Sequence, residues 1–434
     1  MATATHGTLS TPPDDPGRRA LLMRLFETAV ATARPEICVP AHLPAAPKGR
    51  LIVIGAGKAA AAMARAVEDH WDGPLSGAVV TRYGYGVPTE RIEVLEAAHP
   101  VPDAAGEAAA RRMIALARDA GPDDLLLFLL SGGGSALMAA PAPGVSLADK
   151  QALTKALLAS GATIHEINVI RRHLSSVKGG RLAAAAHPAP IVTLAISDVA
   201  GDDPAAIACG PTVADSTTFA DATAIVAKYR IAPTEAVARH LSEAAEESLK
   251  PGDPRLATAT YHLIARPAGM LAAAAREAEA AGYRPVVLGD ALEGEARAVA
   301  ADHAARALDQ ARSGAPVAIL SGGELTVTIT GTGRGGPNRE YALALALALG
   351  GDPRVAAIAC DTDGADGAPG SDGADVAGAI VGPDTLARAA ERSVDGAAHL
   401  ADNDAGGFFE RLGDAVVTGP TRTNVNDFRA VLVN

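Results

Sequence analysis

Cysteine is scarce in this chain, which has only three cysteines among its 434 residues. Cys38, Cys209 and Cys360 lie far apart, and none of them belongs to a Cys-x-x-Cys pair. This spacing excludes a disulfide framework and a cysteine-based zinc site, because both need paired cysteines. Isolated thiols are typical of a reducing compartment, and we therefore expect a cytoplasmic protein.

Basic residues are also few, and the net charge of −12 makes the chain acidic. Nonspecific binding to nucleic acid usually needs a basic surface, so the sequence argues against a nucleic-acid partner. No apolar run is long enough to cross a bilayer, which argues against a membrane protein. Residues 1–17 lack the basic start and apolar run of a signal peptide, and we expect a disordered tail there. A small-molecule substrate is the expected partner, and a homodimer is one option for the assembly.

Aromatic residues make up only 3% of the chain, so alanine and small aliphatic residues must fill its cores. A chain of 434 residues is too long for one core and should divide into two domains. Alternating strand and helix patterns predict three-layer α/β architecture in both. A stretch rich in Pro and Gly at 250–254 suggests domains at 18–250 and 255–434. We expect a Rossmann-like first domain, a mixed sheet in the second, and an active site in the cleft between them.

Glycine-rich turns follow predicted strands in both halves of the chain. An apolar run at 125–130 ends in Ser-Gly-Gly-Gly-Ser, and another at 317–320 ends in Ser-Gly-Gly-Glu. After the second turn, alternating Thr, Val and Ile predict a strand at 325–330, and Arg334 then precedes a helix that contains Arg339. Glycines leave backbone N–H groups open to an anion, and a helix N-terminus adds positive potential. Both places therefore suit an anionic substrate or the phosphates of a nucleotide.

A third glycine turn, Gly-Ala-Gly-Lys at 55–58, follows a predicted buried strand. With Ala60 it matches the G-x-G-x-x-A variant of the dinucleotide fingerprint, but the acidic residue expected about twenty residues later is missing. A packing turn with a solvated Lys58 explains the pattern equally well. A lysine beside a helix N-terminus favours a phosphate contact over both interpretations.

A predicted helix at 164–177 carries polar side chains at the spacing i, i+3, i+7 and i+10. This spacing places Asn168, Arg171, Ser175 and Lys178 on one face, and the Gly-Gly pair that follows should end the helix with a left-handed cap. Such a face is usually solvated surface. Glycine-rich loops flank this one at both ends, so a solvated and a functional face are equally well supported.

Acidic residues follow two further predicted strands. Asp198 comes after the strand at 191–196, at the edge where open α/β sheets bind ligands, and we prefer catalysis or metal binding over a loop cap. Asp361 and Asp363 follow the strand at 355–360. They are not part of an EF-hand, because the twelfth position of that loop is not Glu. A Mg²⁺ site that shares one or two carboxylates with substrate phosphates fits better than an ordinary acidic turn.

Together these motifs resemble the bacterial and archaeal glycerate 2-kinases that carry a C-terminal MOFRL domain. The resemblance covers most of the chain after residue 20, and the motifs follow the order of the family. Three features depart from the family pattern: Arg339 stands where Gln is usual, Gly406 stands where an aromatic residue is common, and the segment 367–375 is longer. The matching segments are 55–59, 99–103, 131–136, 165–168, 178–181, 197–212, 321–324, 333–336, 361–364 and 423–427.

The resemblance implies ATP- and Mg²⁺-dependent phosphorylation of D-glycerate at its 2-hydroxyl, which gives 2-phosphoglycerate. It implies that Lys58, Asp198 and Arg334 are the catalytic residues, and we expect Asp361 and Asp363 to hold the metal. Arg171 or Lys178 is expected to meet the glycerate carboxylate, and Asn338 and Asn424 are further candidate ligands of glycerate. The residues expected to bind the nucleotide are Gly55, Gly57, Ser131, Gly132, Gly133, Gly134, Ser135, Ser321, Gly322, Gly323 and Glu324.

Two other functions stay open at this point. Members of this family have often been labelled hydroxypyruvate reductases, and the turn at 55–58 permits an NAD(P)H-dependent reductase. The missing ribose-binding acid and the acidic cluster at 361–366 count against it. The other is a non-catalytic sensor of a sugar acid or phosphate, which would not need a lysine, an arginine and several carboxylates in one cleft.

Overall fold

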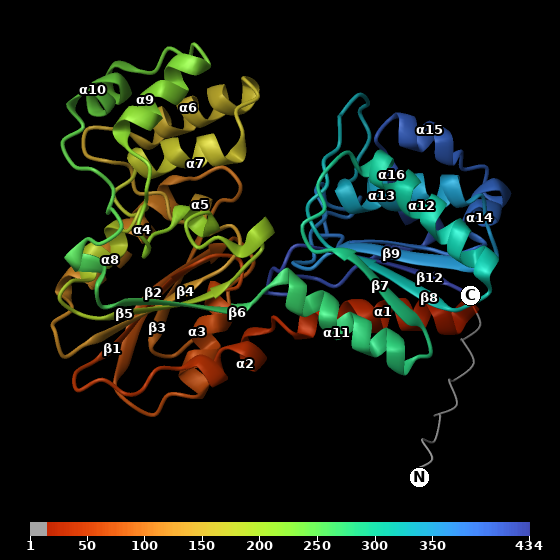
Figure 1. Ribbon diagram of the computed structural model, residues 1–434, viewed down its shortest axis with the longest axis horizontal. Coiled ribbons are helices and arrows are strands. Elements are labelled where there is room, and N and C mark those ends of the chain that lie inside the picture. The colour runs from red at the N-terminus through yellow and green to blue at the C-terminus, as the bar shows by residue number, and fades with distance from the viewer. Residues whose placement is uncertain (1–14) are drawn as a thin grey trace, which may run out of the picture. The chain divides into compact units, whose positions relative to one another are not determined.

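The structure is a computed structural model that describes residues 15–434. These residues form two compact units, and each is described by itself (Figure 1). The Rossmann unit consists of Ala33–Arg266 and Arg422–Asn424. The mixed-sheet unit consists of the chain up to Thr32, Pro267–Thr421 and Val425–Asn434.

The Rossmann unit is built on a six-stranded parallel sheet in the order β3-β2-β1-β4-β5-β6. Every residue of β1 and β4 is buried, which explains why these two runs are continuously apolar. Figure 1 shows α3 and α4 on opposite sides of the sheet, so the expected three-layer, Rossmann-like fold is confirmed. The strands are β1 (Leu51–Ala56), β2 (Leu75–Arg82), β3 (Ile92–Ala97), β4 (Leu125–Leu130), β5 (Ile191–Ile196) and β6 (Ala259–Ala265).

A layer of four helices adds a separate apolar cluster to this unit (Figure 1). Three of the four, α6, α7 and α9, begin with a capping box, in which a Ser or Thr side chain and an acidic side chain satisfy the first N–H groups. The four helices are α6 (Leu147–Ala159), α7 (Ile164–His173), α9 (Phe219–Lys228) and α10 (Glu235–Glu243). The other helices of the unit are α2 (Pro35–Cys38), α3 (Ala60–Asp69), α4 (Ala104–Asp119), α5 (Gly134–Leu137) and α8 (Arg181–Ala186).

Helix α7 is shorter than the polar pattern predicted. It ends at His173, and Ser175 then pairs with Pro141 in an isolated β-bridge. Lys178 lies in the loop before α8, and Gly180, with φ of 78°, precedes α8 rather than ending α7. The prediction of four polar residues on one helix face is therefore wrong for the last two of them, because the chain leaves the helix to make this bridge.

The mixed-sheet unit has a six-stranded sheet in the order β11-β10-β9-β12-β8-β7, in which only β7 and β8 pair in parallel. This confirms the mixed sheet that was expected. The strands are β7 (Arg284–Gly289), β8 (Val317–Ser321), β9 (Val355–Asp361), β10 (Gly378–Val381), β11 (Ala415–Val416) and β12 (Asp427–Val433). The helices are α1 (Asp15–Ala31), α11 (Pro267–Ala280), α12 (Ala296–Ser313), α13 (Pro337–Leu349), α14 (Thr385–Glu391), α15 (Gly396–Ala401) and α16 (Ala405–Leu412).

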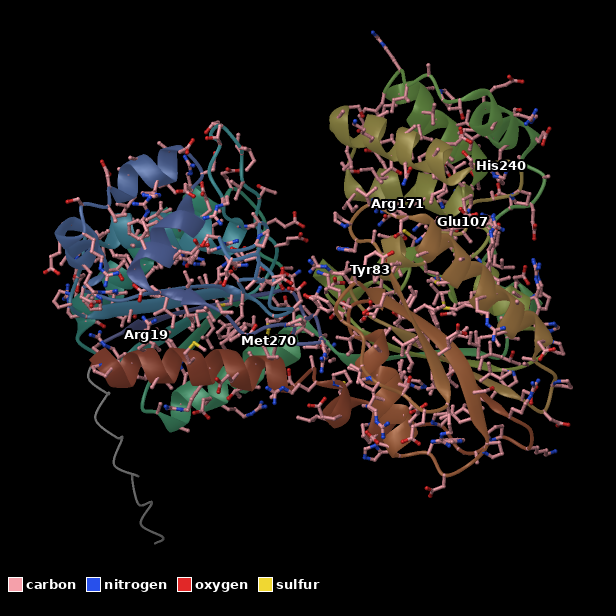
Figure 2. All side chains as sticks on the ribbon, turned by 180° about the vertical axis from the view of Figure 1, so that it is seen from behind. Arg19, Tyr83, Glu107, Arg171, His240 and Met270 are labelled. Carbon is pink, nitrogen blue, oxygen red and sulfur yellow. The ribbon has the colours of Figure 1, made fainter. Side chains whose placement is uncertain are left out.

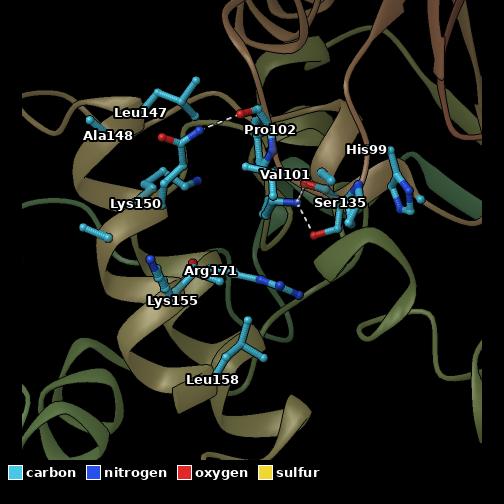
Figure 3. Close-up of a pocket in the computed structure, with 18 residues that line it drawn as sticks. His99, Val101, Pro102, Ser135, Leu147, Ala148, Lys150, Lys155, Leu158 and Arg171 are labelled. Carbon is cyan, nitrogen blue, oxygen red and sulfur yellow. Dashed lines mark hydrogen bonds between the residues drawn. The ribbon is translucent and has the colours of Figure 1, made fainter. Parts of the chain in front are cut away.

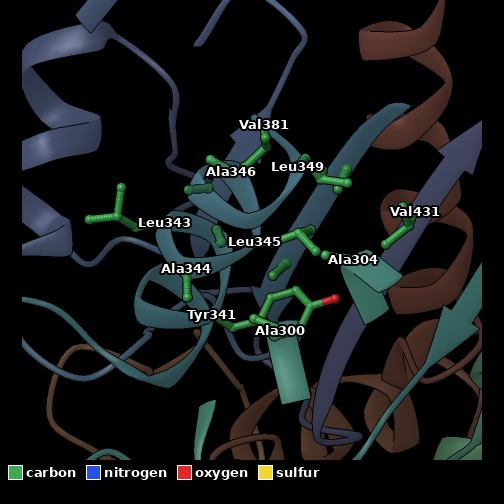
Figure 4. Close-up of a cluster of buried hydrophobic side chains, with 14 of the residues drawn as sticks. Ala300, Ala304, Tyr341, Leu343, Ala344, Leu345, Ala346, Leu349, Val381 and Val431 are labelled. Atoms are coloured by element: carbon green, nitrogen blue, oxygen red, sulfur yellow. The ribbon is translucent and has the colours of Figure 1, made fainter. Parts of the chain in front are cut away.

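Helix α13 lies at the centre of the core of this unit. Its side chains pack against small residues of α12 and against β10 and β12, as Figure 4 shows for Tyr341, Leu345, Ala304 and Val431. Alanines on α12 let the two helices approach closely, which suits a chain that has few aromatic residues. None of the helices within residues 15–434 is both long and apolar enough to span a membrane.

The compact units divide the chain at other places than the expected boundaries. Helix α1 packs on α11, β9 and β12 and so belongs to the mixed-sheet unit. Strand β6 pairs with β5 and so belongs to the Rossmann unit. The Pro- and Gly-rich stretch at 250–254 is a turn between these two strands rather than a linker between domains. Of the expected disordered tail, residues 1–14 lie outside the described part of the chain, and residues 15–17 begin α1.

The strand predicted at 325–330 does not form. These residues make only one isolated bridge, between Thr326 and Glu295. Their N–H groups bond to side chains instead, because Thr328 N donates to Glu295 Oε1 (2.7 Å) and Thr330 N donates to Asn403 Oδ1 (2.8 Å). The alternating pattern therefore marks an ordered loop, since side chains replace the neighbouring strand.

Candidate active site

The two glycine turns of the Rossmann unit lie side by side at the carboxyl ends of β1 and β4. These strands are neighbours, and the order of the sheet reverses between them, which is where open α/β sheets form a ligand-binding crevice. The turns at 55–58 and 131–135 follow directly. Asp198 follows β5, the next strand of the sheet.

Backbone and side-chain hydrogen bonds lock the two turns together. Lys58 N donates to Gly132 O (2.8 Å), and Ala59 N donates to Ser131 Oγ (2.9 Å). A Cβ at Gly57, where φ is 139°, would lie 2.2 Å from Ser131 Oγ, so only glycine fits there. Ser131 is 1% exposed, and its hydroxyl oxygen holds the turn rather than facing solvent.

Three of the predicted site residues gather around the Gly132–Gly133 peptide. A Cβ at Gly132 would lie 2.1 Å from Asp198 Oδ2 and 2.5 Å from Asn424 Nδ2. A Cβ at Gly133 would lie 3.5 Å from Lys58 Cγ. Position 132 must therefore be glycine because Asp198 and Asn424 approach its backbone, and position 133 favours glycine because its φ is 80°.

Asn424 reaches this place from near the C-terminus of the chain. Its Nδ2 donates to Asp198 Oδ2 at 2.9 Å, which holds one carboxylate oxygen in position. The neighbouring Thr423 donates its hydroxyl to Ala33 O (2.6 Å), so the segment is fixed within the Rossmann unit. The sequence marked Asn424 as a ligand of glycerate, but it gave no sign of this contact with Asp198.

A pocket of about 640 Å³ opens beside the second turn (Figure 3). Gly133, Ser135, Arg171 and Lys178 all line it, so the structure brings the predicted cations to a predicted turn. Lys178 is 1% exposed, and its Nζ donates to Ser135 O (2.8 Å), Ser135 Oγ (2.8 Å) and Ala208 O (3.2 Å). Burial lowers the pKa of Lys178 to about 8. Three protein oxygens already match its three donors, so its Nζ has no N–H left to donate to a ligand.

Arg334 lies on a tight loop of the mixed-sheet unit. Its Nη2 is 3.2 Å from Glu410 Oε2, and its side chain is 41% exposed. The loop is held closely, since Arg334 N donates to Asp404 Oδ1 (3.1 Å) and Gly406 N donates to Arg334 O (2.8 Å). The guanidinium is therefore presented at the surface of this unit on a fixed backbone.

The helix N-terminus after Arg334 is not an open anion site, which corrects the prediction. Asp366 places its carboxylate there, because Asn338 N donates to Oδ1 (2.9 Å) and Arg339 N donates to Oδ2 (3.0 Å). Arg339 Nε also donates to Asp366 Oδ2 (2.9 Å), and both side chains are fully buried. A carboxylate of the chain itself thus occupies the place that was predicted for a ligand.

A buried polar network supports the Ser-Gly-Gly-Glu turn at 321–324. Arg429 Nη1 and Nη2 donate to Gly322 O (3.2 Å) and Gly323 O (2.7 Å), and Arg429 also pairs with Asp427 at 2.7 Å. Asn338 is 1% exposed and donates its Nδ2 to Asp427 Oδ1 (2.7 Å). Asn338 therefore supports this strand end, and its role as a ligand of glycerate stays a prediction.

Of the two candidate metal ligands, Asp361 is the last residue of β9 and Asp363 follows it. Asp361 Oδ1 accepts from Asp363 N (2.9 Å), and Asp363 Oδ1 accepts from Ala365 N (2.7 Å). Within residues 15–434, no group of three or more His, Cys, Asp or Glu side chains is arranged to hold a metal ion. Asp361 is partly exposed, whereas Asp363 is 0% exposed. Magnesium needs as few as one protein carboxylate when substrate phosphates supply the other oxygens, so the fit to this ion rests on Asp361.

The three departures from the family pattern meet in one place. Arg339 donates Nη2 to Ala368 O (2.5 Å), which lies in the longer segment at 367–375. A Cβ at Gly406 would lie 2.9 Å from Arg339 Nη1 and 2.6 Å from Arg334 O. The arginine, the glycine and the longer segment are therefore parts of one local arrangement beside the loop of Arg334.

Comparisons with known proteins agree with these observations. Residues 21–242 match the domain of unknown function DUF4147, and residues 317–427 match the MOFRL family. The D-glycerate 2-kinase of Thermotoga maritima is 37% identical over 95% of this chain and 98% of its own length. The glycerate 2-kinase of Pyrococcus horikoshii is 41% identical over 89% and 88%. An Agrobacterium vitis protein, provisionally named hydroxypyruvate reductase, is 51% identical over 97% and 95%.

A solved structure gives the same result. The crystal structure of glycerate kinase from Thermotoga maritima superposes with a TM-score of 0.86 at 36% identity, and it covers 96% of this chain and 100% of its own. The similarity in sequence and in structure extends over both units. This chain therefore belongs to the glycerate 2-kinase family, whose members join a DUF4147 domain to a MOFRL domain.

Proposed function

We propose that this protein is a glycerate 2-kinase, which uses ATP and Mg²⁺ to phosphorylate D-glycerate at its 2-hydroxyl. The observation that carries the proposal is the meeting of Lys58 and Asp198 at a glycine turn beside the switch point of the sheet. Phosphoryl transfer needs positioning and positive charge more than covalent chemistry. A cation, a carboxylate and open glycine backbone supply these needs at one edge of the Rossmann unit.

Asp198 is the proposed general base. It would accept the proton of the 2-hydroxyl as that oxygen attacks the phosphoryl group. Asn424 donates to one of its carboxylate oxygens and so orients the other. In this arrangement the 2-hydroxyl oxygen of glycerate lies beside Asp198 near Gly132. Lys58, which lies near Gly133, counters the negative charge of the phosphoryl group during transfer.

Arg334 is the second proposed cation for that charge, and the glycine turns at 55–57, 131–135 and 321–324 are the proposed places for the nucleotide. ATP would supply the phosphoryl group, and Mg²⁺ held by Asp361 or Asp363 would neutralise phosphate charge. Lys58 and Asp198 belong to the Rossmann unit and Arg334 to the mixed-sheet unit. An active site in the cleft between the domains stays a prediction.

The purified protein should release ADP from ATP when D-glycerate and Mg²⁺ are present, and it should form 2-phosphoglycerate. Enolase added without a mutase converts only the 2-phosphate, so this coupled assay identifies the phosphorylated position. With hydroxypyruvate and NADH or NADPH, we expect no oxidation above background, since β2 ends in Thr81 and Arg82 and has no acidic residue at its carboxyl end to bind the ribose. Turnover of NAD(P)H without ADP release would instead support a reductase.

Asn substitutions at Asp361 and Asp363 should raise the Mg²⁺ concentration needed for half-maximal activity, because each removes a charged oxygen ligand. The measurement is a magnesium titration of ADP release. Asp372→Asn is the matched control, since Asp372 is an exposed residue of the same segment that caps Ala374 N. An unchanged magnesium requirement in both variants would place the ion elsewhere, with Asp198 or Asp202 as the next candidates.

A further inference from the structure

The pocket beside the turn at 131–135 has a charge that a small acid does not explain. Lys150, Lys155, Arg171 and Lys178 line it, and no Asp or Glu is among the described residues that do so. A carboxylate of one negative charge is matched by one or two cations. Four cations without a counter-ion instead suit a ligand with several negative charges, such as a polyphosphate.

Among these four residues, Lys150 has the most unusual environment for a charged side chain. It is only 8% exposed, and within residues 15–434 its Nζ has no hydrogen-bond partner. An ammonium buried without a partner destabilises a fold unless a ligand compensates it. Lys178, by contrast, is satisfied by three protein oxygens. Lys150 is therefore a buried cation of this pocket that no described protein group satisfies.

The rest of the pocket is apolar and large. Its volume of about 640 Å³ lies in the range of sites for drug-sized ligands, and a three-carbon acid would fill only part of it. Val101 and Leu158, which are 62% and 60% exposed, line it together with Leu147. Figure 3 shows Lys150 and Arg171 on one side and His99 and Ser135 on the other. Apolar and cationic side chains thus line the same pocket, which suits a ligand with a flat apolar group and an anionic tail.

The pocket lies beside Lys58, the proposed catalytic lysine. Gly133 lines the pocket, and a Cβ there would lie 3.5 Å from Lys58 Cγ. A polyphosphate that enters from Lys150 along this turn therefore ends beside Lys58. Glycerate would then lie on the side of the turn where Gly132 meets Asp198.

We propose that this pocket binds the nucleoside triphosphate, with Lys150 and Arg171 on the phosphates and with Leu158, near the C-terminal end of α6, against the base. The inference rests on the proposed kinase function and assigns the donor to a place within it. It also changes the expected ligand of Arg171 and Lys178 from the carboxylate of glycerate to the phosphates of the nucleotide.

Because the charge of Lys150 depends on pH, its contribution to nucleotide affinity should also depend on pH. Burial, followed by repulsion from Lys178 and Arg171, lowers the pKa of Lys150 to about 7, while Glu107 on α4 and Cys209 act in the opposite direction (Figure 2 marks Arg171 and Glu107). A phosphate binds the protonated form better. The contribution of Lys150 to nucleotide affinity should therefore be largest below pH 7 and should shrink as the pH rises above it.

The test is calorimetric titration of the full-length protein with ATP, with inorganic tripolyphosphate and, separately, with D-glycerate. Lys150→Met should weaken ATP and tripolyphosphate binding about 10- to 100-fold at pH 6.5, and the ratio to the wild type should approach one at pH 8.5. Leu158→Asn, which removes the apolar contact without adding a charge, should weaken ATP but not tripolyphosphate. Lys48→Met, at an exposed lysine that does not line the pocket, is the control and should change either affinity by less than about threefold.

Two results would overturn the proposal. One is an ATP affinity of Lys150→Met equal to that of the wild type, and the other is a loss of D-glycerate binding with ATP binding retained. The variant should fold, because methionine replaces a buried ammonium that has no partner, and its urea midpoint at pH 6.5 should equal or exceed that of the wild type. A wild-type protein that binds ATP but releases no ADP with D-glycerate would contradict the proposed function and leave this site intact.

Discussion

Alanine in place of Lys58 should lower kcat by about a hundredfold or more while the fold survives. Loss of one preorganised donor to the transferring charge has an effect of this size. The turn should persist, because the hydrogen bond that joins it to the second turn runs from the backbone N–H of Lys58 to Gly132 O. The measurement is the rate of ADP release with saturating ATP and D-glycerate, together with a circular dichroism spectrum of the variant.

The matched control is Lys48→Ala, at an exposed lysine shortly before β1, which should keep the wild-type kcat. Arg334→Ala should behave like Lys58→Ala if both cations act on the same charge. Arg334→Lys should not fully restore the rate, since a lysine cannot form the planar two-point contact of a guanidinium. A Lys58→Ala enzyme that keeps most of its kcat would return this residue to the solvated turn that the sequence also permitted.

The strand ends of the Rossmann unit could be predicted because their signals are local. Continuous apolar runs marked β1 and β4, and the glycines after them had to be turns. Parallel neighbours place their carboxyl ends at one edge, so the proximity of Lys58 and Asp198 to one turn follows from the order of the strands. This part of the site can therefore be predicted without side-chain contacts between segments that are far apart in the sequence.

The contacts that could not be predicted are those between distant segments. Asn424 bonds to Asp198 across 226 positions of sequence, and no spacing rule indicates such a pair. Strand β6 follows a Pro- and Gly-rich turn that has the composition of a linker, and only its pairing with β5 assigns it to the first sheet. The periodic pattern also predicted a longer helix than α7, because Ser175 pairs with Pro141 in a β-bridge instead of continuing the helix.

Asp366 shows why the predicted anion site at the N-terminus of α13 was wrong. The glycines, the arginine and the helix N-terminus are all present, but a carboxylate 27 positions from Arg339 reaches back to them. A sequence motif defines the groups that attract an anion, and it does not reveal whether the anion is part of the chain. The consequence is a stabilising role for Arg339 in place of the ligand-binding role.

Replacement of Arg339 by methionine should destabilise the mixed-sheet unit by about 3–5 kcal/mol, the usual cost of leaving one partner of a buried ion pair uncompensated. Arg339 and Asp366 are both fully buried, and the guanidinium also donates to the backbone oxygens of Asp366 and Ala368. The measurement is the urea midpoint of the transition that a probe in this unit reports, since a two-unit chain need not unfold in one step.

Two comparison variants separate the buried charge from simple loss of a side chain. Arg306→Ala removes an exposed ion pair with Asp302, whose side chains are 54% and 56% exposed, and should cost no more than about 1 kcal/mol. Adding Asp366→Asn to Arg339→Met removes the unpaired charge and should recover part of the loss. If Arg339→Met costs no more than Arg306→Ala, the pair is not needed for stability. Its place beside Gly406 and the loop of Arg334 would then have to be explained through catalysis.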